Sequence, residues 1–174
     1  MTSPPERLLI DMDIFLYRSC QVAESEYDLG GDVWTLFTDL KDAKFTLEEQ
    51  LAKLEDDTGL PLADALFCIS DPEGNFRKDL AVSYKANRKD TRKPCGYPAL
   101  REWAFKKYDC VTFSHCEGDD VMGILATQSP EENFLIVSED KDLKQIPGWH
   151  WIDEQEEHID SLKGAEFFWY QVLA

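Results

Sequence analysis

Short apolar segments alternate with longer helical patterns along this sequence, and that alternation constrains the fold more than any other feature. Segments 7–11, 65–70, 111–114 and 134–138 have the length and composition of buried strands, and 149–152 fits a fifth. Apolar residues recur at helical spacing over 14–24, 33–54, 97–108 and 119–127. Strands that alternate with helices indicate βαβ units. We therefore expect an α/β fold with a mainly parallel central sheet flanked by helices.

At 174 residues the chain is long enough for one domain, and its 43% apolar residues are enough to form a core. No linker or repeat divides residues 1–174. Its five cysteines are odd in number and show no CxxC spacing, which argues against a disulfide framework or a zinc site. No leader-like N-terminus and no run of 18 apolar residues is present, so we expect a cytoplasmic protein without a membrane partner.

Acidic residues follow four of the predicted strands. They are Asp11 and Asp13 after the first, Asp71 after the second, Glu117, Asp119 and Asp120 after the third, and Glu139, Asp140 and Asp142 after the fourth. The carboxyl ends of parallel strands meet at one edge of a sheet, where such a cluster needs cations to offset its repulsion. Oxygen ligands favour Mg²⁺ or Mn²⁺, and two such ions suit phosphodiester cleavage. Helix N-termini also favour acids, so Asp119 or Asp140 taken singly fits a purely capping role.

A basic segment at 77–93 stands out from an acidic chain whose net charge is −17. The overall charge argues against a nucleic-acid partner, but this segment holds seven of the eighteen basic residues: Arg77, Lys78, Lys85, Arg88, Lys89, Arg92 and Lys93. We expect an irregular loop or short helices that bind phosphates and become ordered around a single strand. The alternative is a solvated loop without a ligand.

Five blocks carry a resemblance to a known family. They are Leu8-Leu-Ile-Asp-Met-Asp, Ser70-Asp-Pro-Glu-Gly-Asn-Phe-Arg, Tyr84-Lys-Ala-Asn-Arg-Lys, Cys116-Glu-Gly-Asp-Asp-Val-Met-Gly and Ser138-Glu-Asp-Lys-Asp-Leu. In this order and spacing they resemble the flap endonuclease superfamily, most closely the 5′-to-3′ exonucleases of podovirus-type phages. The resemblance implies a PIN-like nuclease domain that acts on DNA with a 5′ end or flap, or on RNA in hybrid with DNA. A role in phage replication or recombination, in the host cytoplasm, is also implied.

The resemblance implies roles for individual residues. One metal site would be formed by Asp11, Asp71, Glu117 and Asp119, and a second by Asp119, Asp140 and Asp142. Asp120 and Asp13 would reach the ions through water, and Asp120 also counts among the candidate ligands. Lys85 and Arg88 match basic residues at the base of an arch, where they would join Asp119 in catalysis by stabilising charge on the scissile phosphate. Tyr84 would stack on a terminal base, or else pack under the loop.

Two departures from the family pattern affect these expectations. Met12 stands where the family often has a small residue. The sequence also stops at Ala174, where the family continues into a Gly-Asp-x-x-Asp turn and a helix-hairpin-helix element. The final segment 167–174 is strongly apolar. We expect an incomplete catalytic unit that needs this downstream part, in the same chain or in a separate polypeptide.

Two other functions compete with the nuclease. A haloacid-dehalogenase-type phosphatase would use Asp11 as a covalent nucleophile and Asp13 as a general acid and base, but the usual Gly-Thr or Gly-Val after the second acid is missing. A catalytically silent module of the same fold would bind DNA or a partner without turnover. Its difficulty is that every acid expected within this chain is retained.

Overall fold

The central sheet of the computed structural model, which describes residues 3–80 and 92–173, has six strands. Their order is β5 (Cys110–Val111), β4 (Leu66–Cys68), β1 (Arg7–Asp11), β6 (Phe134–Val137), β7 (Gly148–Ile152) and β8 (Gln155–Ile159). Neighbouring strands are parallel except for the β7–β8 pair, which is antiparallel. The mainly parallel α/β architecture is thus confirmed.

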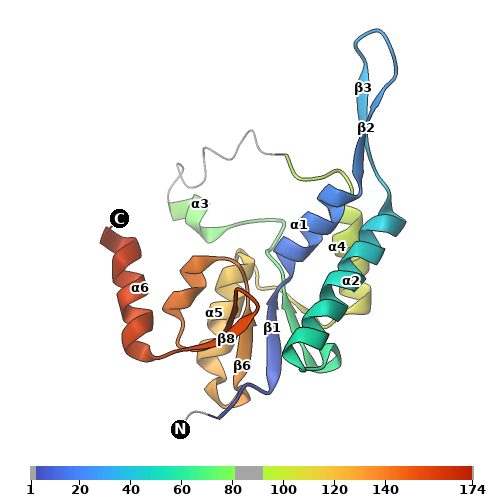
Figure 1. Ribbon diagram of the computed structural model, residues 1–174. Helices are drawn as coiled ribbons and strands as arrows, with labels where there is room; N and C mark the ends of the chain where they lie inside the picture. The colour runs from blue at the N-terminus through green and yellow to red at the C-terminus, as the bar shows by residue number, and fades with distance from the viewer. Residues whose placement is uncertain (1–2, 81–91, 174) are drawn as a thin grey trace.

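Helices cover both faces of the sheet (Figure 1). α1 (Met12–Val22), α2 (Leu40–Thr58) and α4 (Tyr97–Lys107) lie on one face, and α5 (Gly118–Gln128) lies on the other. The strands alternate accordingly, because Leu8 and Ile10 of β1 join the core under α1 and α2 while Leu9 joins the core under α5. A sheet buried on both faces explains why its central strands are continuous apolar runs.

A hairpin that the sequence did not predict projects from this body (Figure 1). β2 (Glu24–Asp28) and β3 (Trp34–Thr38) pair antiparallel, so the helices expected over 14–24 and 33–54 are wrong at those ends. Segment 33–38 is rich in aromatic and β-branched residues, which favour strands, and the turn is made by three residues of positive φ at 30–32. α2 begins at Leu40 because the Asp39 carboxylate caps it, accepting bonds from the backbone of Lys41 (2.8 Å) and Asp42 (3.3 Å).

Two further elements near the C-terminal end were not predicted. Strand β8 follows β7 through a two-residue turn at Asp153 and Glu154, both of positive φ. α6 (Ser161–Leu173) includes most of the apolar segment 167–174 and packs against the 3₁₀ helix η4 (Lys141–Gln145). Two more 3₁₀ turns, η1 (Leu62–Asp64) and η3 (Pro130–Glu132), precede β4 and β6. No helix within the described residues has the length and apolar character needed to cross a bilayer.

Candidate metal and nucleic-acid site

The strand-end acids gather at one edge of the sheet. Asp11 is the last residue of β1, Asp71 follows β4, and Asp140 follows β6. β4, β1 and β6 are adjacent and parallel, so their carboxyl ends meet there. Glu117, Asp119 and Asp120 reach the same edge from the N-terminus of α5, which packs on β1 and β4. Residues more than a hundred positions apart in sequence therefore converge.

The tightest cluster lies at the start of α5. Each of Glu117, Asp119 and Asp120 offers a carboxylate oxygen, and these oxygens lie within 4.8 Å of one another. Glu117 and Asp120 form a capping box, in which the Asp120 carboxylate accepts from the Glu117 backbone N–H (3.0 Å). Burial, followed by the charges of Asp120 and Glu117, raises the pKa of Asp119. Two of the acids thus serve as caps as well, while the cluster as a whole favours a bound cation.

A guanidinium supplies positive charge to this cluster. Arg77, from the short helix α3 (Phe76–Leu80), donates to the two carboxylate oxygens of Asp120 at 2.5 and 2.6 Å and approaches Glu117 at 3.5 Å. We expected Arg77 to bind nucleic acid, but here it faces the acids. Its guanidinium is thus paired with a carboxylate of its own chain.

Arg77→Gln is expected to strengthen binding of Mn²⁺ to the substrate-free protein. Arg77 competes with a cation for the same oxygens, so its loss should raise the affinity by about three- to tenfold, or about 0.7–1.4 kcal/mol. Calorimetric titration measures this directly. Arg18→Gln is the matched control, because Arg18 forms a bidentate pair with Glu139 outside the cluster. Equal affinity in wild type and Arg77→Gln would show that the ion does not use these carboxylates.

Asp11 is partly buried beside the end of β6. The Ser138 hydroxyl donates to its carboxylate at 2.9 Å and accepts from the Asp140 backbone N–H at 3.1 Å. Burial raises the pKa of Asp11 from 3.8 to about 7, and the charges of Asp13, Asp119 and Asp140 add to the rise. The acids of β1, α5 and the β6 end are therefore close enough to interact. Asp140 itself is exposed, caps η4 and accepts from the Asp142 backbone N–H at 2.9 Å.

Asp71, an expected ligand, and Asp13, expected to act through water, are engaged by other groups of the protein. The Asp71 carboxylate accepts from the backbone N–H groups of Glu73 (3.0 Å) and His115 (2.7 Å), and these bonds lower its pKa. The Asp13 carboxylate accepts from the Tyr97 hydroxyl (2.5 Å) and from the Ser70 backbone N–H (2.9 Å). Asp71 and Asp13 are therefore fixed in place by the fold before any ion binds.

Some bases of the described part of the basic segment contact other groups of the protein. Lys78 is exposed on α3, whereas Arg92 pairs with Glu24 of the hairpin at 2.5 and 3.0 Å. The Lys93 ammonium lies 4.2 Å from the centre of the Tyr97 ring. Our predictions for Tyr84, Lys85, Arg88 and Lys89 fall outside the described residues.

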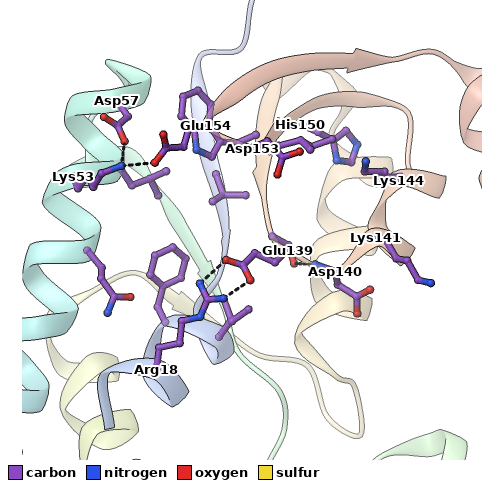
Figure 2. A pocket seen from close by; sticks show the side chains of 18 residues that line it. Arg18, Lys53, Asp57, Glu139, Asp140, Lys141, Lys144, His150, Asp153 and Glu154 are labelled. Atoms are coloured by element: carbon purple, nitrogen blue, oxygen red, sulfur yellow. Dashed lines mark hydrogen bonds and ion pairs between the residues drawn. The ribbon is translucent and has the colours of Figure 1, made fainter. Parts of the chain in front are cut away.

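A cavity of about 730 Å³ opens beside the acidic edge, between α1, α2, the end of β6 and the β7–β8 turn (Figure 2). Arg18 pairs with Glu139 in its wall, and Lys53 bridges Asp57 and Glu154 (Figure 2). Glu139, grouped by sequence with Asp140 and Asp142, is thus paired with a base. The lining holds four Lys or Arg and five Asp or Glu side chains, so its charge does not favour a phosphate.

Three residues that hold the acids were not singled out from sequence. Ser138 bonds Asp11, Ser70 bonds Asp13, and Tyr97 bonds Asp13 from the start of α4. The two serines had a visible signal, because each directly precedes an acid at the end of a predicted strand. Tyr97 had none, since it lies 84 positions from Asp13.

Comparison with known proteins decides the family. Residues 7–166 match the family described as 5′-3′ exonuclease, N-terminal resolvase-like domain. The chain belongs to this family. Its relatives include the exodeoxyribonuclease of Enterobacteria phage T3, 31% identical over 146 residues, and the exonuclease of Escherichia phage T7, 30% identical over 146 residues. Each alignment covers 80% of this chain and 48% or 49% of the relative, so the chain spans about half the length of these exonucleases.

Solved structures agree on the fold. The phage T5 5′-exonuclease with zinc bound superposes with a TM-score of 0.52 at 15% identity, covering 88% of this chain and 58% of that one. The phage T5 flap endonuclease in a complex with DNA and metal ions superposes with a TM-score of 0.52 at 10% identity, covering 88% and 57%. These likenesses confirm the PIN-like arrangement of the exonuclease family. Neither the family match nor these structures support the phosphatase.

Proposed function

We propose that this chain is the catalytic domain of a nuclease that hydrolyses phosphodiester bonds of DNA from a 5′ end or at a 5′ flap, using two divalent ions. The observation that carries the proposal is the convergence of acids from β1, β4, β6 and α5 at one edge, with three carboxylates within 4.8 Å. Its support from relatives is the similarity to the phage T3 and T7 exonucleases. A role in phage replication or recombination is part of the proposal.

The donor set fits Mg²⁺ or Mn²⁺. Every candidate ligand offers carboxylate oxygen, which Mg²⁺ and Mn²⁺ prefer. The pKa values of Asp11 and Asp119 are raised, so their ionised carboxylates are destabilised and a bound cation would stabilise them. In the proposal, Asp11, Asp71, Glu117 and Asp119 hold one ion, and Asp119, Asp140 and Asp142 hold the other, with Asp120 and Asp13 behind them. When bound, such ions activate water and stabilise the leaving oxygen in phosphodiester hydrolysis.

The basic segment would hold the substrate. A chain of net charge −17 repels phosphates overall, so binding depends on segment 77–93 and should weaken steeply with salt. In the proposal Lys85 and Arg88 act on turnover, while Arg77, Lys78, Tyr84, Lys89, Arg92 and Lys93 contact the strand. The chain spans about half the length of its phage relatives. The proposal therefore includes a further segment, in the same or a separate polypeptide, that holds the duplex.

Cleavage of 5′-labelled substrates tests the proposal. Duplex DNA, a 5′ flap and an RNA–DNA hybrid are incubated with the protein, alone and with a downstream helix-hairpin-helix segment, in Mg²⁺, Mn²⁺ or EDTA. We expect short products from the 5′ end or flap, only with a divalent ion, and more of them when the downstream segment is present. Binding of DNA without turnover under every condition would instead support a silent binding module, and cleavage undiminished by EDTA would exclude the metal mechanism.

A further inference from the structure

A partly buried chain of hydrogen bonds runs behind the acidic edge. Tyr97, only 5% exposed at the start of α4, donates its hydroxyl to one oxygen of Asp13 at 2.5 Å. The other oxygen of Asp13 accepts from the Ser70 backbone N–H at 2.9 Å, and the Ser70 hydroxyl accepts from the Gly118 backbone N–H at 2.9 Å. Burial and the charge of Asp13 raise the pKa of Tyr97, so its hydroxyl stays protonated and remains a donor.

Three members of this chain lie within two residues of a candidate metal ligand. Asp13 is two residues from Asp11, and Ser70 directly precedes Asp71. Gly118 stands between Glu117 and Asp119. The hydrogen bonds therefore fix the relative positions of the β1, β4 and α5 segments that carry the carboxylates.

The packing around Asp13 leaves little room for adjustment. A Cβ atom added to Gly118 would lie 3.2 Å from the Asp13 carboxylate and 3.5 Å from the Cys68 carbonyl oxygen. A side chain at position 118 would require the Asp13 carboxylate to shift by a few tenths of an ångström. A displacement of Asp13 would therefore be passed to the start of α5 and to its acids.

Tyr97 also anchors the end of the basic segment. Its ring packs under the Lys93 ammonium, 4.2 Å away, and the preceding Gly96 backbone N–H donates to the Thr38 hydroxyl at 3.0 Å. Arg92 is fixed to Glu24 nearby. One side chain thus contacts both the segment expected to bind phosphates and the network behind the acids.

We propose that Tyr97 is a positioning residue of this site, whose hydroxyl, through Asp13, holds the carboxylates of β1, β4 and α5 at the spacing that divalent ions require. The inference rests on the proposed function, because it assigns Tyr97 a part in metal binding and turnover. Tyr97 touches neither ion nor substrate in this role. It acts through Asp13, and its ring also contacts Lys93 at the end of the basic segment.

Tyr97→Phe tests the inference because it removes the hydroxyl and keeps the ring. We expect the affinity for Mn²⁺, measured by calorimetry without substrate, to fall about three- to tenfold. In cleavage assays kcat at saturating Mg²⁺ should fall about tenfold while KM for DNA stays within about twofold, since a misplaced ligand affects the transition state more than binding. Tyr108→Phe is the matched control, because Tyr108 ends the same helix and packs against Phe67, in the core.

A double-mutant cycle tests the route through Asp13. In an Asp13→Asn background, Tyr97→Phe should change Mn²⁺ affinity by less than about twofold, because the partner of the hydroxyl is already altered. A lower melting temperature for Tyr97→Phe with unchanged Mn²⁺ affinity and kcat would overturn the inference and leave only a packing role. Absence of metal-dependent cleavage in the wild type, with the downstream segment supplied, would instead count against the proposed function, while the calorimetric comparison would still decide the role of Tyr97.

Discussion

Asp119→Asn is expected to lower the rate of DNA cleavage by about 10³-fold or more, which corresponds to about 4 kcal/mol of transition-state stabilisation. Asp119 is the ligand that both proposed ions share, so its loss should weaken the two sites together. The fold should not suffer. Burial and the charges of Asp120 and Glu117 already raise the pKa of Asp119, so a neutral side chain relieves repulsion there.

Three measurements separate loss of chemistry from loss of structure. Single-turnover cleavage gives the rate, calorimetry gives Mn²⁺ binding, and thermal unfolding in EDTA gives stability. Asp56→Asn is the control, because it removes the same charge from an exposed position on α2. We expect the control to match wild type in all three. Mn²⁺ binding to Asp119→Asn at wild-type affinity would remove Asp119 from the metal site.

The elements that build the acidic edge could be predicted because their sequence signals are local and agree with their burial. β1, β4 and β6 are short apolar runs, and each is buried between helices as a central parallel strand should be. The position of acids directly after these strands was visible as well. Convergence then followed from one general property of parallel sheets, so the edge itself could be derived.

The hairpin and the edge strand could not be derived in the same way. Apolar residues of segment 33–38 continue the three- and four-residue spacing of α2 by coincidence. The positive-φ turn at 30–32 instead places this segment beside β2, where it forms a strand. β8 has the sequence Gln-Glu-Glu-His-Ile, with no apolar alternation to mark it. It forms because the turn at Asp153 and Glu154 brings it beside β7, which is a tertiary effect.

Within the site, residue type was predictable and hydrogen-bond partners were not. An acid at a strand end can face an ion, cap a helix or accept backbone N–H groups, and Asp71 and Asp13 do the last of these. Arg77 illustrates the same problem for a base, since a carboxylate of its own chain competes with the phosphate that the sequence suggested. Partners so distant in sequence become visible only once the sheet is assembled.

Asp11→Asn is expected to stabilise the metal-free protein above pH 7 and to abolish its high-affinity binding of Mn²⁺. The pKa of Asp11 is raised from 3.8 to about 7 in the folded protein, chiefly by burial. The folded state therefore binds this proton more tightly than the unfolded state does. The stabilising contribution of the protonated form is fully present below about pH 4 and is lost as pH rises through about 7, at up to about 1.4 kcal/mol per pH unit.

Unfolding in denaturant, followed from pH 4 to pH 8 in EDTA, measures this linkage. Wild type should lose stability across that window relative to Asp11→Asn, by an amount on the order of 2–4 kcal/mol at pH 8, because the asparagine has no proton to release. A divalent ion should reverse the loss in wild type only, since it needs the carboxylate and displaces its proton. Binding of Mn²⁺ to wild type below pH 7 should accordingly release a proton, which calorimetry in two buffers of different ionisation enthalpy detects. If the two proteins showed parallel stability curves and wild type released no proton, Asp11 would be an ordinary exposed acid and the first ion would have to be held without it.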